Sequence, residues 1–343
     1  MEYGERQLPD SLRLQTTLPV IAAPMFIVSG PELVSAACQA GVIGSFPAPN
    51  ARELDELDSW MGQLNDDLAR AREERPDARV APWAANMIIH PSYKRRGAEL
   101  ELIAKHQPEL VITALGGPAP AVEVVHDYGG LVFADVNSLE YARKAAATGV
   151  DGMVLVSAGA GGHTGAITGF AFLEQVREFF DGFIVLAGGI SSGRAVRAAQ
   201  TLGADLVYMG TKFIAAQESR AQSDYKDMVC EANLEDLVCT DAFTGVRANM
   251  LEPSIRRAGL DPDELESKKD IDFDDPHADQ KAWRDIWSAG QGVGMTHEVQ
   301  PVADIVAQLQ AEYAEAVSRE RGFDPWTQIA LEDRTHVNEE VES

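Results

Sequence analysis

Short, almost wholly apolar segments alternate along the chain with longer stretches whose hydrophobic residues recur at helical spacing. Residues 183–187 are hydrophobic at every position, which is typical of a parallel strand buried on both faces. Seven further segments share this apolar character, namely residues 20–26, 42–46, 80–89, 110–115, 131–136, 152–156 and 206–209. We therefore predict eight strands in a pattern that alternates with helices.

Proline and glycine mark the ends of the segments with helical spacing. Proline is the first residue of one such segment, and glycine directly follows the last residue of three. These are common signals for the start and the end of a helix. Helices are predicted over residues 31–40, 53–75, 138–148, 193–202 and 302–321.

Eight strand–helix alternations before residue 212 favour an α/β fold of the (β/α)8 TIM barrel type. A doubly wound open sheet has the same alternation and is the alternative at this point. The alternation stops near residue 220, and residues 221–286 are acidic and only weakly periodic. We predict a barrel formed by 1–220 and 287–327, a mainly helical insertion at 221–286 that caps the site, and a flexible acidic tail at 328–343.

The net charge sets limits on the partners of the protein. The 343 residues include 29 Lys and Arg against 54 Asp and Glu, for a formal charge of −25 at pH 7. This balance argues against nucleic acid and against an anionic membrane surface, because both are bound through basic side chains. A small-molecule substrate is the expected partner, and the sequence leaves the oligomeric state, including a homo-oligomer, open.

The three cysteines do not form a disulfide framework, and neither they nor the histidines have the spacing of metal ligands. No catalytic metal is therefore expected. The N-terminus lacks a basic segment followed by an apolar one, and no apolar run approaches the roughly 18–20 residues of a membrane span. A cytoplasmic location is the expectation.

Candidate chemistry gathers where the predicted strands end, since the active site of such a barrel lies at the C-terminal ends of its strands. The sequence Ala23-Pro24-Met25 follows the first strand, Asn86 lies near the end of the third, and Asp135 near the end of the fifth.

Two glycine-containing turns are candidates for binding a phosphate. Ala187-Gly188-Gly189 follows the seventh strand and Gly210-Thr211 follows the eighth, the two positions at which barrels often bind phosphate. Glycine lets backbone N–H groups approach an anion closely, and Thr211 adds a hydroxyl. Such glycines also occur in plain turns, but their presence at both strands favours a phosphate site.

His163 is the strongest single candidate for a catalytic residue. It lies in a glycine-rich loop, and histidine has a pKa suited to a general base. A loop histidine that bonds a carbonyl is the alternative. A second loop, 287–294, carries Ser288, Gln291 and Gly292, which either bind phosphate or ring atoms or form an ordinary glycine loop.

Taken together, the motifs resemble the nitronate monooxygenase family, formerly called 2-nitropropane dioxygenases. The resemblance is carried by IAAPM (21–25), Asn86-Met87, AGAGGHTG (158–165), LAGGI (186–190), YMGTKF (208–213) and WSAGQGVG (287–294). It implies an FMN-dependent barrel that binds FMN non-covalently, with the phosphate at the loops after strands seven and eight. The ring would lie near Ala23, Pro24, Met25, Asn86, Gly161 and Gly162, with further flavin contacts from Ser288, Gln291 and Gly292.

The resemblance also implies a reaction. His163 falls on the catalytic histidine of the family, and alkyl nitronates or nitroalkanes would be oxidised with O2 to carbonyl compounds and nitrite. Two alternatives stay open: an NAD(P)H-dependent flavin reductase on the same fold, acting on enoyl-acyl carrier protein or quinone, and a non-catalytic flavin-binding module. A charge on Asp135 would discourage an anionic nitronate unless it is turned away. Phe243, Asn249 and Met250 of the insertion are candidates for substrate contacts.

Overall fold

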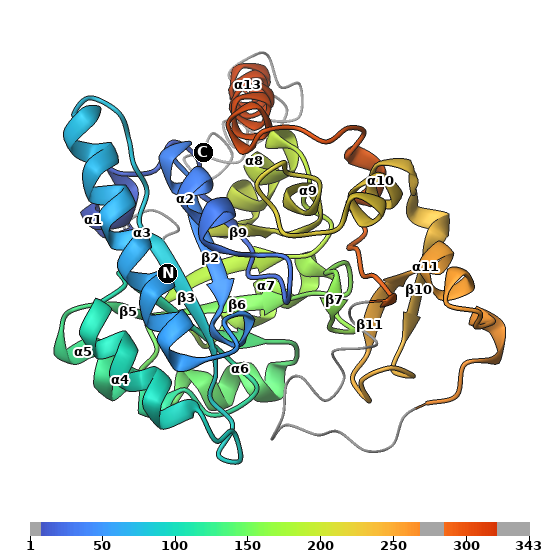
Figure 1. Cartoon of the computed structure of the whole chain (residues 1–343), viewed down its shortest axis with the longest axis horizontal. Helices are drawn as coiled ribbons and strands as arrows, with labels where there is room; N and C mark the ends of the chain where they lie inside the picture. The colour runs from blue at the N-terminus through green and yellow to red at the C-terminus, as the bar shows by residue number, and fades with distance from the viewer. Residues whose placement is uncertain (1–7, 268–284, 321–343) are drawn as a thin grey trace, which may run out of the picture.

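Eight parallel strands form a closed barrel in a computed structural model that describes residues 8–267 and 285–320. Helices surround the barrel (Figure 1). Closure of the sheet confirms the (β/α)8 barrel and rules out the open doubly wound sheet, which would leave two edge strands. The barrel strands, in their order around the sheet, are β1 (Val20–Ala22), β2 (Ile43–Pro47), β3 (Trp83–Ile88), β4 (Leu110–Ala114), β5 (Leu131–Val136), β6 (Gly152–Val156), β8 (Phe183–Ala187) and β9 (Leu206–Met209).

The predicted strand bounds agree with the structure for β5, β6, β8 and β9, whereas the first predicted strand is too long. Strand β1 ends at Ala22, four residues before the predicted end. Pro24 follows and has no N–H for a sheet ladder, and Ile27 has a φ of 57°, which no strand residue adopts. The apolar run 23–28 is therefore a loop at the C-terminal end of the barrel.

The outer helices begin and end close to the predicted residues. Side-chain oxygens of Ser138 and Ser192 accept hydrogen bonds from the backbone N–H groups of Tyr141 and Ala195, which caps two of these helices. The helices around the barrel are α2 (Pro31–Gln39), α3 (Leu54–Glu74), α4 (Arg96–His106), α5 (Ala119–Asp127), α6 (Leu139–Ala146), α7 (Gly169–Arg177), α8 (Gly193–Leu202) and α13 (Val302–Glu320).

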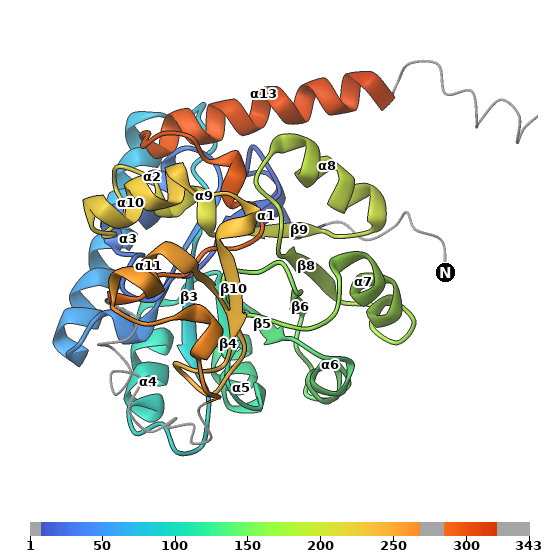
Figure 2. The same cartoon turned by 90° about the vertical axis from the view of Figure 1, so that its right-hand side faces the viewer.

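Figure 2 shows α13, the last described helix, lying along the outside of the barrel next to α8 and close to α2. Helix α13 thereby completes the ring of helices beside α2. Shorter elements are α1 (Asp10–Arg13), α9 (Thr211–Ile214) and the 3-10 helices η1 (Ala48–Asn50), η2 (Leu234–Asp236), η3 (Pro262–Glu264) and η4 (Val293–Met295).

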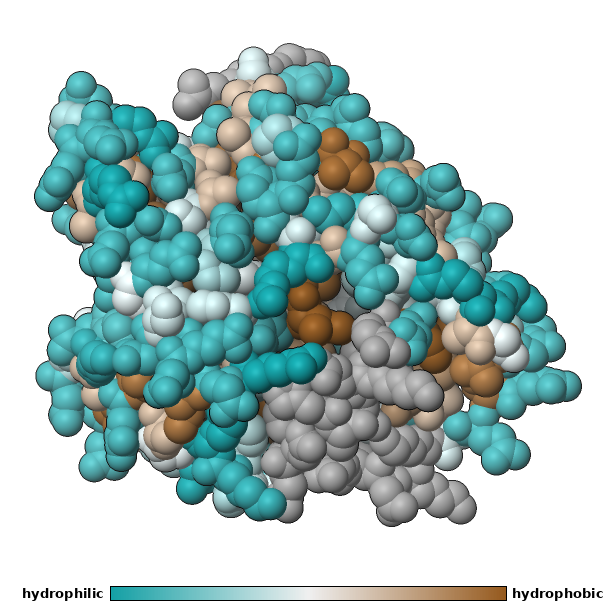
Figure 3. Space-filling view, viewed as in Figure 1, coloured by the Kyte–Doolittle hydropathy of each residue, from teal (hydrophilic) through white to brown (hydrophobic). Residues whose placement is uncertain are grey.

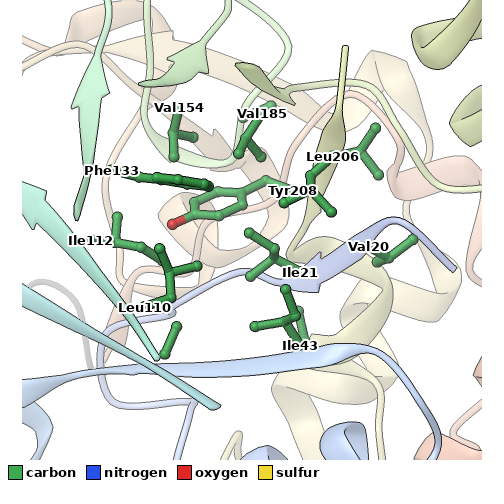
Figure 4. Packing of buried hydrophobic residues seen from close by; sticks show 14 of the residues in the cluster. Val20, Ile21, Ile43, Leu110, Ile112, Phe133, Val154, Val185, Leu206 and Tyr208 are labelled. Atoms are coloured by element: carbon green, nitrogen blue, oxygen red, sulfur yellow. The ribbon is translucent and has the colours of Figure 1, made fainter. Parts of the chain in front are cut away.

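Apolar side chains fill the barrel (Figure 4). Ile21, Ile112, Phe133 and Val154 from four different strands are fully buried and surround the ring of Tyr208. Burial on this scale is the main favourable contribution to folding. Outside, the surface is mostly hydrophilic, with hydrophobic residues gathered in a few places, one of them near the centre of the face in Figure 3.

The segment 221–286 contains a β-hairpin that the sequence analysis does not predict. Its helices are α10 (Ser223–Glu231) and α11 (Glu252–Arg257), and its antiparallel strands are β10 (Leu237–Thr240) and β11 (Ala248–Leu251). Strand β11 also pairs with β7 (Gly162–His163), a short strand in the loop after β6. The segment is thus joined to the barrel through a three-stranded sheet, in the order β10-β11-β7.

The predicted acidic tail, 328–343, lies outside the described residues, as do 268–284 of the segment and 321–327 of the predicted barrel. Within 8–267 and 285–320, no helix combines the length and the apolar character that crossing a membrane requires.

Candidate active site

Loops from three strands meet at the C-terminal end of the barrel through their backbones. The Gly159 carbonyl, after β6, accepts hydrogen bonds from the N–H of Gly189 after β8 (3.2 Å) and from the N–H of Gln291 (2.9 Å). The N–H of Gly290 donates to Thr211 Oγ1, after β9, at 2.8 Å. The structure therefore brings both predicted phosphate loops together with the 287–294 loop.

Close backbone approach explains the glycines in this group. Gly188 has a φ of 115°, and a Cβ there would overlap Ser157 Oγ and lie 2.8 Å from the amide nitrogen of Ala160. Ser157 Oγ is itself occupied, because it donates to the Ala187 carbonyl at 2.6 Å. Gly189 has a φ of 71°, but a Cβ there would meet no atom of residues 8–267 and 285–320 within 4 Å. Gly188 is thus required by packing, whereas Gly189 faces open space.

A phosphate group in this open space would be bound differently from the way the sequence predicts. The Gly189 N–H is occupied by the Gly159 carbonyl, so Gly189 would admit a ligand through its missing side chain. Thr211 accepts the hydrogen bond from Gly290 and keeps a hydroxyl proton that it can donate. Two further predicted glycines pack closely: a Cβ on Gly161 would lie 2.6 Å from the Gly290 nitrogen, and one on Gly292 would overlap Ser191 Oγ.

The loop after β1 lies beside the loop after β9. The Ala23 N–H donates to the Met209 carbonyl at 3.0 Å, and a Cβ placed on Gly210 would lie 3.6 Å from both Ala23 Cβ and Met25 Sδ. Ala23 and Met25 therefore lie next to Gly210, which brings these two predicted parts of the site together.

Asn50 holds this loop, a role that the sequence analysis does not assign. Its Oδ1 accepts from the Ile27 N–H at 2.9 Å, and its Nδ2 donates to the carbonyls of Met25 (2.9 Å) and Ser29 (2.8 Å). The three bonds stabilise Ile27 in the left-handed region, which is unfavourable for a β-branched residue. Since no local sequence pattern links residue 50 to residue 27, the structure was needed to find this contact.

Asn86 and Asp135 form a polar pair on β3 and β5. Asn86 is 8% exposed, and its Nδ2 donates to the Ile112 carbonyl (3.3 Å) and to Asp135 Oδ2 (3.4 Å). Asp135 Oδ1 is buried and has no hydrogen-bond partner among the described residues. Burial raises the pKa of Asp135 to about 7, against the opposing effect of the hydrogen bond from Asn86. The site therefore contains a carboxyl group that gains and loses its proton near neutral pH.

His163 lies in the predicted glycine-rich loop, at the point where this loop forms the two-residue strand β7. As part of β7 it pairs with Ala248 of β11, and its side chain is exposed. Its Nε2 lies 3.2 Å from Oγ1 of Thr244, a buried residue of the 221–286 segment. A hydroxyl group is therefore one of the partners of the imidazole.

The insertion residues predicted to touch substrate have other contacts. Asn249 Nδ2 donates to the carbonyls of Ala158 (3.0 Å) and Ala160 (2.7 Å) and so supports the glycine-rich loop. Met250 is 2% exposed and forms an isolated bridge with Ser288. Phe243 packs against a small apolar cluster around Ile255. Asn249 and Thr244 shape the site from the hairpin, which the weak periodicity of the segment does not reveal.

The sequence and the overall fold are similar to those of known proteins. A family model described as nitronate monooxygenase matches residues 11–312. A nitronate monooxygenase from Paraburkholderia phytofirmans is 28% identical over 94% of this chain and 99% of its own. A Mycobacterium tuberculosis protein is 35% identical over 165 residues, which are 48% of this chain and 44% of that protein. The structure of a nitroalkane oxidase from Streptomyces ansochromogenes aligns with a TM-score of 0.75 and 25% identity, covering 90% of this chain and 99% of that one.

Proposed function

Because the chain belongs to the nitronate monooxygenase family, we propose that it binds FMN at the C-terminal end of the barrel and oxidises alkyl nitronates or nitroalkanes with O2. The products would be a carbonyl compound and nitrite. The observation that carries the proposal is the convergence of the loops after β6, β8 and β9 around the open face of Gly189, with His163 on the adjoining strand β7.

The residues that would hold FMN come from six parts of the chain. Gly188, Gly189, Gly210 and Thr211 would surround the phosphate, since their turns supply close backbone approach and a hydroxyl donor. The ring would lie against a set of residues that share this end of the barrel: Ala23, Pro24, Met25, Asn86, Gly161, Gly162, Ser288, Gln291 and Gly292. The site needs no formal positive charge for this, which reconciles an anionic ligand with a protein of charge −25.

His163 would act on the proton of the substrate. A neutral imidazole can accept the α-proton of a nitroalkane, and an imidazolium can orient the oxygen atoms of a nitronate. Thr244 Oγ1, at 3.2 Å from Nε2, orients the ring for either task. Bound FMN supplies the electron-transfer chemistry, whereas the protein supplies position and proton transfer.

Purified protein tests the proposal directly. We expect it to carry FMN and to consume O2 with propyl-2-nitronate, and we expect His163→Ala to retain FMN but lose turnover of neutral nitroalkanes. Flavin-loaded protein that is inert to every nitronate would overturn the proposed function.

The same protein under anaerobic conditions separates the alternatives. Rapid reduction of the flavin by NADH or NADPH, but not by nitronate, would identify a flavin reductase instead. Turnover that His163→Ala leaves unchanged would contradict the assignment of His163.

A further inference from the structure

Asp135 presents a carboxyl group to the interior of the barrel without a basic partner. It follows Phe133 by two residues in β5, so both side chains lie on the same face of the strand, and Phe133 points into the barrel (Figure 4). Asn86 Nδ2 is the partner of Asp135 Oδ2, and Oδ1 has no partner in the part of the chain that the structure describes. Among residues 8–267 and 285–320, no Lys, Arg or His side chain forms an ion pair with Asp135.

The neighbouring strands offer Asp135 little that could neutralise a charge. From β3 the facing group is the neutral Asn86, and from β6 the residue in register is the apolar Val154. Thr113 of β4 donates its hydroxyl to the backbone carbonyl of Phe133. The titratable neighbour is Tyr208 of β9, whose ring crosses the barrel interior in Figure 4.

The hydroxyl of Tyr208 is also buried without a partner among the described residues. Burial, together with the nearby carboxyl of Asp135, raises its pKa well above its ordinary value. Tyr208 therefore stays neutral across the working range of pH. This leaves Asp135 as a group of the proposed site that changes charge near neutrality.

The charge of Asp135 has a direct consequence for an anionic ligand in the same space. A protonated carboxyl is neutral and can donate a hydrogen bond to an oxygen anion. An ionised carboxyl repels that anion, and the repulsion is strong where little water screens it. The two protonation states of one side chain thus favour ligands of different charge.

We propose that Asp135 determines which charge state of the substrate the site accepts. With its proton in place, it admits and hydrogen-bonds the anionic oxygen of a nitronate. Without the proton, it restricts the site to neutral compounds such as nitroalkanes. The identity of the ligands rests on the proposed function, but the selection by charge rests on Asp135 and its surroundings alone.

Isobutyrate and isobutyramide test this selection without any turnover. The two are nearly equal in shape, only the first is an anion, and isobutyrate resembles propyl-2-nitronate in shape and charge. Binding of each is measured by calorimetry at about pH 6 and about pH 8.5, on wild-type protein as purified and on Asp135→Asn. Glu140→Gln, which removes an exposed carboxylate paired with Lys144, is the matched control.

The wild-type protein should bind isobutyrate more weakly at the higher pH, and this weakening should exceed that of Asp135→Asn by about 30-fold if only the protonated form binds the anion. Every titratable group other than Asp135 is common to both proteins, so the ratio between their pH responses isolates Asp135. Isobutyramide binding should not change with pH, and Glu140→Gln should behave as wild type.

Equal pH responses of wild type and Asp135→Asn would overturn the proposal. If Asp135→Asn does not fold, Asp135→Ser provides a second neutral variant with the same expected result. Equal responses in a protein that oxidises nitronates would refute the role of Asp135 and leave the proposed function standing. Unequal responses in a flavin-loaded protein that is inert to nitronates would support the role of Asp135 and refute the proposed function.

Discussion

The imidazole Nε2 of His163 lies 3.2 Å from the hydroxyl of Thr244, which comes 81 residues later in the chain. Thr244 Oγ1 also lies 3.0 Å from the carbonyl oxygen of Val246, to which it can donate, and accepts from the Val246 N–H at 3.3 Å. The hydroxyl has one proton, so donation to Val246 leaves it an acceptor for His163 Nε2–H. Thr244 is thus a positioning residue, which sets the ring orientation and the nitrogen that carries the proton.

Thr244→Val should lower kcat for a neutral nitroalkane by about tenfold with little change in KM, because the imidazole loses its partner while the flavin site is intact. The pH at which activity rises should shift as well. Thr244→Ser keeps the hydroxyl and should restore both properties. Steady-state kinetics against pH measures the effect, and equal behaviour of the two variants would contradict the positioning role.

Alanine at the two neighbouring glycines after β8 should have different effects. Gly188→Ala should lower the free energy of unfolding by about 3 kcal/mol, because it adds a clash with Ser157 to an unfavourable φ. Gly189→Ala should cost only about 1 kcal/mol, since its methyl group enters open space.

The effects of the two substitutions on FMN affinity should follow the opposite order, with the larger loss in Gly189→Ala. The Gly189 methyl group would occupy the space proposed for the ligand, so the Kd for FMN should rise by about tenfold or more, equivalent to about 1.4 kcal/mol. Urea unfolding and flavin titration of the folded variants measure the two quantities. If Gly189→Ala binds FMN as wild type does, the phosphate is held elsewhere.

The stability of the ligand-free protein should depend on Asp135 and pH in a defined direction. Folding raises the pKa of this group from 3.8 to about 7, so the folded state binds the proton more tightly than the unfolded chain. The stabilising contribution is complete below about pH 4 and is lost as pH rises towards 7, by at most about 4 kcal/mol.

Asp135→Asn lacks this titration. The unfolding free energy of Asp135→Asn minus that of wild type should therefore increase from pH 4 to pH 7 and stay constant above pH 7. Urea unfolding of both proteins across this range is the measurement, and a constant difference would show that the Asp135 pKa is not raised.

Asn50→Ala should destabilise the protein by about 2–3 kcal/mol and weaken FMN binding, because three hydrogen bonds to the loop after β1 are lost. Asn50→Asp should lower stability and FMN affinity at least as much. Its second carboxylate oxygen replaces Nδ2 and cannot donate to the carbonyls of Met25 and Ser29. Gln39→Ala, which removes bonds to Ser35 and Arg75 outside the site, is the control and should leave FMN affinity unchanged. Normal FMN affinity in Asn50→Ala would limit Asn50 to a structural role.

The barrel could be predicted from sequence because its signals are local. Apolar runs such as 183–187 and capping residues such as Ser192 each identify an element without reference to distant residues. The apolar run 20–26 misled the prediction, since hydrophobicity alone does not distinguish a strand from a loop that is half-buried at the barrel end.

The candidate site was only partly predictable for a related reason. The glycines and His163 stand in recognisable motifs, but their partners Asn50, Thr244 and Asn249 act through side-chain bonds to distant backbone or side-chain groups. The hairpin β10–β11 was missed because its four-residue strands are too short for alternation to stand out. The raised pKa of Asp135 likewise depends on burial of its carboxyl group in the folded protein, which the sequence alone does not show.

The pairing of β7 with β11 has a consequence for the order of events during synthesis. Gly162 and His163 obtain their strand partners only when residues 248 and 249 have left the ribosome, long after the six preceding barrel strands are available. A nascent chain halted before residue 244 therefore contains every barrel strand, but neither Thr244 nor the strand β11 that pairs with His163. The contacts that hold the proposed catalytic residue are in this sense completed late in synthesis.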